Sequence, residues 1–424
     1  MEPLVRVVVV NYDGGDMTLS CLRHLVATEW PADRLELVLV DNGSHDDIVT
    51  PVRAEMPSVR VVESASNRGF AGGCNLGLHE REGTDYVALV NNDAMVSPGW
   101  LRPLVTALAN DPQVGAACPK ILFEGRFAEV TIESATHRRG RSDGRALGVR
   151  VGGATVGDVD VWPRVQLVTG FWGPEGDTGE QWTAARATLR VLTPDDGAEH
   201  ECRLRVTADR PTRISLASTP RRNDRVAGPE PQWLAVPLGN PRDVINNVGT
   251  VLVDDGYAAD RGYLEADRGQ YDTPDDVFAW CGGAVLLRGA YLDDVGLFDE
   301  RLFLYYEDVE LSWRGAKRGW RYRYVPGSVV RHLHAATSID GSADKRYYDD
   351  RNHLLVAARH ASAAETIRNV VHYLLVTASY ARRDILSPML RGHRPRPAQL
   401  RERAAAFAGF LRLLPSMLRS RLLQ

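Results

Sequence analysis

The sequence predicts an open α/β sheet that is interrupted by an all-β insertion and followed by a basic helical extension. Up to about residue 126, short runs of β-branched residues alternate with segments of helical apolar spacing. Further along, apolar residues alternate with polar ones, and Gly, Pro and Asp turns separate the runs. The last part of the chain is rich in arginine. These observations divide the chain into 1–130, 131–243, 244–360 and 361–424.

Strands are predicted where nearly every residue is apolar, because such runs suit a parallel sheet that is buried on both faces. One helix is predicted from Thr18 to Thr28, where leucines recur at helical spacing, and another from Gly72 to Glu82. This βαβα series indicates an open α/β sheet. The predicted strands are Val5 to Val10, Leu35 to Val40, Val59 to Val62 and Tyr86 to Val90.

The segment 131–243 reads as a small inserted β-sandwich, because alternating stretches are separated by turns at short spacing. The α/β pattern resumes at about 244, so the insertion interrupts one domain. The segment 361–424 has eleven arginines against three acidic residues, a formal balance of +8. Apolar residues at helical spacing between the arginines predict basic amphipathic helices.

Composition excludes several classes of protein. The 424 residues include 51 basic and 55 acidic side chains and 44% hydrophobic residues, which excludes a disordered or collagen-like chain. A formal charge of −4 gives no global basis for nucleic-acid binding, and we expect no nucleic-acid partner. The five cysteines are scattered and do not have the spacing of metal ligands or of a disulfide framework, which fits a reducing compartment. The sequence also shows no signal-peptide pattern and no run of about 18 apolar residues. We therefore expect a cytoplasmic protein.

Polar clusters follow three of the predicted strands. They are Asn11-Tyr12, Asp41-Asn42-Gly43-Ser44 and Asn91-Asn92-Asp93. A single cluster of Asp, Asn and Gly after a strand usually only forms a turn or caps a helix. Three of them at successive strand ends favour a ligand crevice, because the carboxyl ends of parallel strands line such a crevice.

Three further motifs are candidate ligand-binding or catalytic sites. The glycine-rich segment Asn67–Gly77 leads into a helix, and its glycines suit either a phosphate or close helix packing. Glu307, Asp308 and Glu310 lie in the first turn of a predicted helix, where carboxylates also suit the helix dipole. His332-Leu333-His334 places two imidazoles in an extended segment, where one can ligate a metal.

Together these motifs resemble family 2 of the inverting, nucleotide-sugar-dependent glycosyltransferases with the GT-A fold. The resemblance is strongest to the branch of bacterial rhamnosyltransferases and related cell-wall and O-antigen enzymes. It covers roughly residues 4–126 and 244–355 and leaves the insertion out. The segments that carry it are VVVVNYDGG, LVLVDNGS, NRGFAGGCNLG, VALVNNDAMVSPGWL, CGGAVLLR, LFDERLFLYYEDVELSWRGAKRGW and VVRHLH.

The resemblance implies a role for each matching residue. Asp41 and Asn11 are expected to contact the nucleoside, and Asp308, next to Glu307, to be the catalytic base. Asp93 and His332 are expected to hold Mn²⁺ or Mg²⁺, with His332 preferred over His334; Asn91 stands where the family has the first carboxylate of its Asp-x-Asp motif. The other expected donor or acceptor contacts are Asn67, Gly69, Asn75, Asn91, Asn92, Gly282 and Gly283. Trp313 and Arg314 are expected either to make such contacts or to pack and orient neighbouring groups.

The function implied is metal-dependent transfer of a sugar from a nucleotide donor to a glycan or polyprenyl-linked glycan, with dTDP-rhamnose as the first choice of donor. A galactofuranosyl-, glucosyl- or N-acetylhexosaminyl-transferase is the alternative of the same fold. A catalytically inactive glycan-binding or scaffolding protein is the alternative of another class. Two roles stay open for 361–424: contact with the inner face of the cytoplasmic membrane, or packing on the catalytic domain or in a homo-oligomer.

Overall fold

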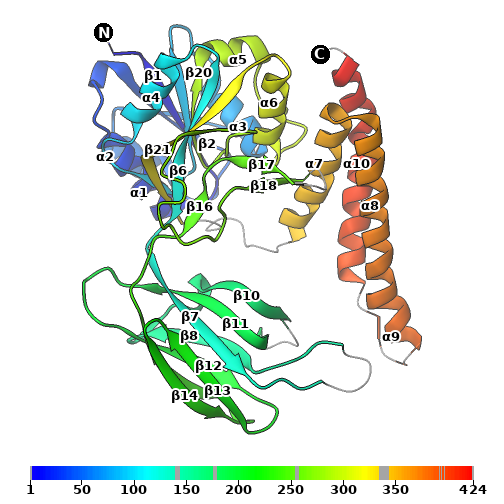
Figure 1. Cartoon of the computed structure of the whole chain (residues 1–424). Helices are drawn as coiled ribbons and strands as arrows, with labels where there is room; N and C mark the ends of the chain where they lie inside the picture. Colours follow the sequence, from blue (N-terminus) through cyan, green and yellow to red (C-terminus); the bar gives the residue numbers. More distant parts are fainter. Residues whose placement is uncertain are drawn as a thin grey trace. The chain divides into compact units, whose positions relative to one another are not determined.

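The structure of the chain is a computed structural model that describes residues 2–138, 144–174, 179–253, 257–333, 343–390, 392, 394–395 and 397–422. It contains two compact units, whose elements are labelled in Figure 1. Unit 1 comprises Met1–Leu122, Asn246–Tyr263 and Gly269–Gln424, and unit 2 comprises Phe123–Ile245 and Leu264–Arg268. The insertion therefore starts before the predicted residue 131, because β6 (Val114–Phe123) leads almost directly into β7 (Arg126–Ser134).

Unit 1 is built on a mixed sheet with a parallel core. In this core β1 (Val5–Asn11) pairs in parallel with β2 (Leu35–Asp41) and with β4 (Tyr86–Val90), and β2 pairs with β3 (Val59–Glu63). These are the four predicted strands, each within one residue of its expected bounds. β20 (Ala284–Arg288) lies antiparallel between β4 and β6.

The remaining strands of unit 1 extend this sheet or lie beside it. The order across the sheet is β19-β21-β6-β20-β4-β1-β2-β3. Here β19 is Asp275–Val277 and β21 is Arg321–His332, while β5 (Ala94–Val96) pairs with β21 and β16 (Ile245–Asn247) pairs with β6. A separate hairpin consists of β17 (Thr250–Leu252) and β18 (Ala258–Asp260).

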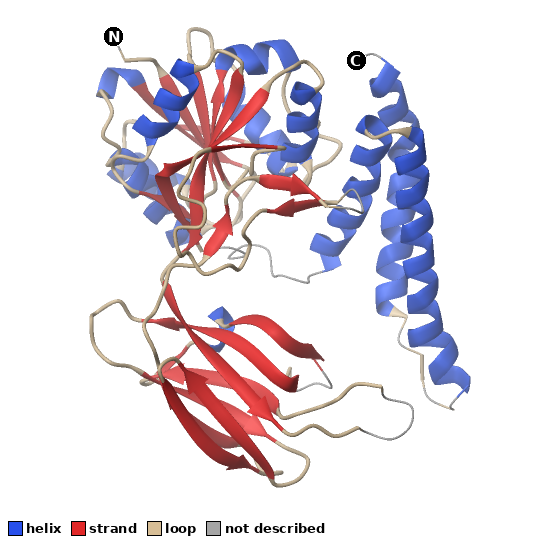
Figure 2. Cartoon of the chain, viewed as in Figure 1, coloured by secondary structure: helices blue, strands red, loops and turns tan. Residues whose placement is uncertain are grey.

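Helices cover both faces of this sheet (Figure 2). Val5, Val7 and Val9 pack with α1 (Gly15–Val26), α2 (Val49–Glu55) and α4 (Leu101–Asn110). Val8 points to the other face, toward α3 (Gly69–Leu78), α5 (Gly289–Val295) and α6 (Glu307–Ala316). Alternate residues of a strand point to opposite faces, which is why five of the seven residues of β1 are valine.

The C-terminal helices belong to unit 1. α7 (Ala343–His360), α8 (Ala363–Ala381) and α10 (Ala398–Leu422) lie side by side in Figure 1, and α9 (Ser387–Leu390) follows a π-helical turn at Arg382–Leu386. One apolar cluster joins them to Leu302 and Val309, so the segment 361–424 completes a bundle that starts earlier, at α7. Among the described helices, none has the length and apolar character to cross a membrane.

Unit 2 is a single antiparallel sheet folded around one apolar core, where the sequence predicted a sandwich of two sheets. The reason is the long strand β11 (Gln181–Thr193), which pairs with β7 along Arg186–Thr193 and with β8 (Arg150–Val156) at its start. It therefore continues from one half of the unit into the other. The other strands are β9 (Val159–Asp160), β10 (Gln166–Pro174), β12 (Glu201–Thr207), β13 (Thr212–Ser218), β14 (Arg221–Ala227) and β15 (Gln232–Pro237).

Candidate active site

Asp93 and His332 are brought together from distant parts of the sequence. His332 pairs with Ala94 across β21 and β5, and its Nε2 lies 2.8 Å from Asp93 Oδ1. Both residues are buried, at 5% and 7% exposure. His332 Nδ1 lies 3.1 Å from Asn246 Oδ1, and this contact helps to orient the ring with Nε2 toward the carboxylate. A carboxylate oxygen and an imidazole nitrogen are both ligands of divalent cations, so this pair suits a cation.

Asn91 adds an amide to this pair. Its Nδ2 lies 3.4 Å from His332 Nε2, and its backbone N–H donates to the Gly283 carbonyl at 3.0 Å. Within the described residues, no group of three or more His, Cys, Asp and Glu side chains is placed to hold a metal. Asp93 and His332 therefore form a two-residue donor set, and His334 lies outside the described residues.

Asp308 is held in the first turn of α6 by two backbone N–H groups. Gly282 donates to Oδ2 at 2.9 Å and Val309 donates to Oδ1 at 2.7 Å. Burial raises the pKa of Asp308 to about 6 against the opposing effect of these two hydrogen bonds. A carboxylate of this kind is ionised at neutral pH and can still accept a proton.

Glu307 lies beside Asp308 but in a different environment. Burial, and then the charge of Asp308, raise the pKa of Glu307 well above its ordinary value. Among the described residues, its Oε2 atom is buried and has no hydrogen-bond partner. Both neighbouring carboxyl groups therefore have raised pKa values, and Asp308, whose two oxygens accept backbone hydrogen bonds, is the candidate base.

The Cys281–Gly283 loop connects the two parts of the site. Gly282 contacts Asp308, while a Cβ on Gly283 would stand 3.8 Å from His332 Cε1. Asp308, Gly282, Gly283, His332 and Asp93 thus form one contiguous group. The fold assembles it from the loop before β20, the start of α6 and the ends of β4 and β21.

Asn11 and Asn92 lie behind the strand ends. Asn11 is fully buried, and its Oδ1 accepts from Thr18 Oγ1 at 2.5 Å, from the Gly14 N–H at 3.2 Å and from Asn92 Nδ2 at 3.3 Å. Its Nδ2 donates to Ser44 Oγ at 2.8 Å. Both amides are therefore engaged by the protein, and they order the loops after β1 and β4.

Asn42, in the polar cluster that follows β2, has a structural role that the sequence did not assign to it. Asn42 is 2% exposed, and its Nδ2 donates to Asn67 Oδ1 and to the Gly69 carbonyl at 3.2 and 3.0 Å. Its Oδ1 accepts from the Arg68 N–H at 3.0 Å. Asn42 thus ties the end of β2 to the glycine-rich segment, whereas Asp41 stays partly exposed. The position of Asn42 directly after Asp41, at the end of a predicted strand, is the sequence feature from which this role could have been inferred.

The glycine-rich segment packs against protein. A Cβ on Gly69, which has φ +71°, would meet the Phe303 carbonyl oxygen at 2.2 Å. On α3, a Cβ on Gly73 or Gly77 would collide with Val10 or Val8. Asn75 holds the Phe298 carbonyl and Glu300 Oε1, both at 3.0 Å. The helix-packing role of these glycines, left open by the sequence, therefore has direct structural support.

Comparison with known families matches residues 6–162 to the family described as Glycosyl transferase family 2. An N-acetylglucosaminyltransferase of Bradyrhizobium elkanii is 30% identical over 129 residues, which make up 29% of this chain and 69% of that protein. The chain belongs to glycosyl transferase family 2. The predicted family membership and the predicted GT-A fold of unit 1 are confirmed.

Other similarities are partial. An N-acetylglucosaminyl-diphospho-decaprenol L-rhamnosyltransferase of Mycobacterium tuberculosis is 38% identical over 84 residues. This segment is 19% of this chain and 27% of that enzyme, so the chain spans about a quarter of the length of this relative. Among solved structures, the mannosyltransferase PcManGT of Pyrobaculum calidifontis, in complex with GDP-Man and Mn²⁺, is 16% identical with a TM-score of 0.43 over 99% of this chain and 79% of that one.

In this family 2 glycosyltransferase, Trp313 and Arg314 support the site from behind. Arg314 donates to the carbonyls of Val295 and Leu297 and to buried Glu310 at 2.7 to 2.8 Å. Trp313 stacks on His360 of α7, with ring centroids 5.7 Å apart. Of the two roles that the sequence left open, these contacts favour packing and orienting, because the helix period turns both residues away from Asp308 and toward α5 and α7.

A second group missed by the sequence analysis holds the segment just before Asp308. Phe303, Tyr305 and Tyr306 have φ values of 66°, 66° and 68°, a left-handed conformation that is strained for aromatic residues. Asn352 of α7 donates to the carbonyls of Leu302, Leu304 and Tyr305 at 2.9, 2.8 and 2.7 Å. These bonds hold the strained segment in place, and no local sequence signal links α7 to it.

Proposed function

We propose that the chain is a metal-dependent inverting glycosyltransferase that moves a sugar from a nucleotide donor to a glycan or a polyprenyl-linked glycan. The observation that carries this proposal is Asp308, an ionised carboxylate fixed by Gly282 in the same loop that contacts His332 and Asn91 through Gly283. Inversion requires a base on the face opposite the leaving group. Asp308 meets that need because it is oriented and has a pKa of about 6.

The other residues have supporting roles in this proposal. Asp41 contacts the nucleoside, and Asn11, Asn42, Asn67 and Asn92 order the loops around it. Asp93 and His332 hold Mn²⁺ or Mg²⁺, a carboxylate and imidazole set that fits these ions when diphosphate and water complete the coordination. When bound, the cation neutralises the charge that develops on the leaving diphosphate.

The finer choice of donor is L-rhamnose from dTDP-rhamnose. One relative is an L-rhamnosyltransferase whose printed substrate is carried on decaprenol, which supports rhamnose and a lipid-linked acceptor for this chain. Another relative is an N-acetylglucosaminyltransferase, which supports an N-acetylhexosaminyl donor instead. Galactofuranosyl and glucosyl donors belong to the same fold and stay as alternatives. An inactive glycan-binding protein is the alternative of another class, and the presence of both Asp93 and Asp308 argues against it.

A direct test combines donors and metals. We expect binding of one nucleotide from dTDP, UDP and GDP, and sugar transfer from its matching donor with inverted anomeric configuration. Transfer should stop in EDTA and return with Mn²⁺ at least as well as with Mg²⁺, because imidazole favours Mn²⁺. Asp93→Ala should raise the Mn²⁺ concentration needed for half-maximal activity, whereas the exposed control Asp294→Ala should leave it unchanged. Full activity in chelator would rule out the metal role, and retention at the anomeric carbon would rule out Asp308 as a base of this kind.

We further propose that the C-terminal helices bring the enzyme to an anionic membrane surface. On α8, Ile367, Val371, Leu374 and Leu375 recur at helical spacing and are 44 to 66% exposed. The surrounding segment carries the +8 balance of 361–424. An apolar stripe together with arginines suits a monotopic contact, in which each arginine contributes about 1 kcal/mol near anionic lipid.

Flotation on liposomes tests the membrane contact. We expect the full chain to float with phosphatidylglycerol-containing liposomes at low salt and much less with neutral ones or at high salt. Leu375→Glu should reduce the bound fraction by about 10-fold, the effect of losing one buried apolar side chain. Val159→Glu, at a position in unit 2 that is equally exposed at 65%, should have no effect. A concentration-dependent dimer that fails to float would favour the homo-oligomer interface instead.

A further inference from the structure

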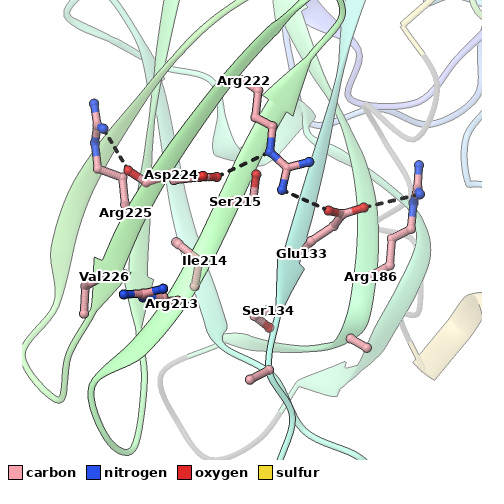
Figure 3. A pocket seen from close by; sticks show the side chains of 12 residues that line it. Glu133, Ser134, Arg186, Arg213, Ile214, Ser215, Arg222, Asp224, Arg225 and Val226 are labelled. Carbon is pink, nitrogen blue, oxygen red and sulfur yellow. Dashed lines mark hydrogen bonds and ion pairs between the residues drawn. The ribbon is translucent and has the colours of Figure 1, made fainter.

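Unit 2 has a polar hollow of about 700 Å³ on its sheet, between the β13–β14 hairpin and strands β7 and β11. Figure 3 shows its side chains, half of which are charged. The hollow lies apart in sequence from every motif shared with glycosyl transferase family 2. Its lining residues include Glu133, Arg186, Arg213, Ser215, Arg222 and Asp224.

The strand register places four of these residues in one row. Arg186 pairs with Glu133, Glu133 with Ser215 and Ser215 with Asp224, across β11, β7, β13 and β14. Side chains of directly paired residues lie on the same face of a sheet. Arg213 and Arg222 stand two residues from this row on β13 and β14, so they point to the same face.

This face has more guanidinium groups than carboxylates. Glu133 lies 3.3 Å from Arg186 and 3.6 Å from Arg222, and Arg222 lies 3.4 Å from Asp224. Among the ion pairs of the described residues, none involves Arg213. Each guanidinium has five N–H donors, so three arginines with two carboxylates leave many donors for a ligand.

The chemistry of the lining selects the class of ligand. Guanidinium groups bind carboxylate and phosphate through paired N–H donors. The lining contains no aromatic side chain among its described residues, which removes the stacking surface that a single-stranded nucleic acid uses. Trp182 of this unit is fully buried and offers no stacking surface.

We propose that this face of unit 2, centred on Arg213 and Arg222, binds a saccharide that carries carboxylate or phosphate groups. That the anionic groups belong to a saccharide is inferred from the proposed transferase function. That the face binds anionic groups is inferred from its arginines alone and does not depend on that function. The enzyme would then hold an acidic acceptor chain through unit 2 independently of the donor site.

Binding by the intact chain tests this proposal at about 150 mM salt, where long-range attraction between exposed charges is screened. The probes are polygalacturonate oligosaccharides for carboxylate, poly(glycerol phosphate) for phosphate, and neutral dextran oligosaccharides and oligo(dT) as controls. We expect at least one acidic saccharide probe to bind, while dextran and oligo(dT) do not. The double variant Arg213→Ala/Arg222→Ala should weaken binding by at least about 10-fold, in line with the loss of two charge-assisted contacts.

The matched control removes the same charge elsewhere on unit 2. Arg203 and Arg221 are exposed, pair with Glu201 and Glu199, and do not line the hollow. Arg203→Ala/Arg221→Ala should therefore leave affinity within about 2-fold, because Arg221 points to the opposite face of β14 from Arg222 and exposed charges outside the hollow contribute little. Absence of binding, equal binding of dextran or oligo(dT), or an equal loss in the control would overturn the proposal. Because the readout is binding without transfer, failure of the transferase assay leaves its outcome unaffected.

Discussion

Asp308→Asn should lower kcat for sugar transfer by at least about 10², the lower range for losing a general base, while donor affinity stays unchanged. The amide keeps the shape of the side chain but cannot take the proton of the acceptor hydroxyl. The wild-type enzyme should show an acid limb in its pH profile near 6, because activity needs the ionised form of Asp308, whose pKa burial raises to about 6. The charge of Asp260 also opposes that ionisation.

Stability measurements separate this loss from unfolding. The pKa of Asp308 is higher in the folded state, so the folded protein favours its protonated form, and stability falls as pH rises through about 6. The neutral amide avoids this cost, and we expect the Tm of Asp308→Asn at pH 8 to equal or exceed that of wild type. Asp294→Asn, an exposed carboxylate paired with Arg318, serves as the matched control with full activity. A kcat for Asp308→Asn within a few-fold of wild type would remove Asp308 from the role of base.

Asn352→Ala should reduce both stability and kcat. It removes the Asn352 amide from the part-buried carbonyls of Leu304 and Tyr305, whereas the Leu302 carbonyl still accepts from Arg351 at 2.7 Å. Each buried polar group that loses its partner costs about 1–3 kcal/mol. The strained residues before Asp308 can then relax and displace the carboxylate from Gly282. A shift of about 1 Å at a reacting group costs on the order of 10² in rate. The measurement is kcat and donor KM at a temperature where circular dichroism shows the variant to be folded.

A second asparagine provides the control for this variant. Asn223 of unit 2 donates one hydrogen bond to the Ala235 carbonyl at 3.2 Å and lies outside the catalytic unit. Asn223→Ala should lower the free energy of unfolding slightly and leave kcat unchanged. If folded Asn352→Ala keeps wild-type kcat, the strained segment does not position Asp308.

The sequence by itself determined the fold class, the parallel strands and the family. Strands β1 to β4 were predictable within one residue. Each contains a short run of mostly apolar residues, and such a run suits a strand that is buried on both faces of a sheet. Asp93, His332 and Asp308 were predictable through the family motifs, and the structure brings them into one group. Strand ends converge in an open sheet, so polar residues that follow them converge too.

Only the tertiary structure decided which polar residues face inward and which hold the site in place. Asn11 and Asn92 look like ligand contacts in the sequence, but burial assigns their amides to protein partners. Asn352 bonds to carbonyls about fifty residues away, and Arg314 turns toward α5, which no local pattern encodes. The folded single sheet of unit 2 depends on β11 pairing with different strands at its two ends. Such contacts arise from long-range packing, where the energetic cost of leaving a buried polar group unpaired selects its partner.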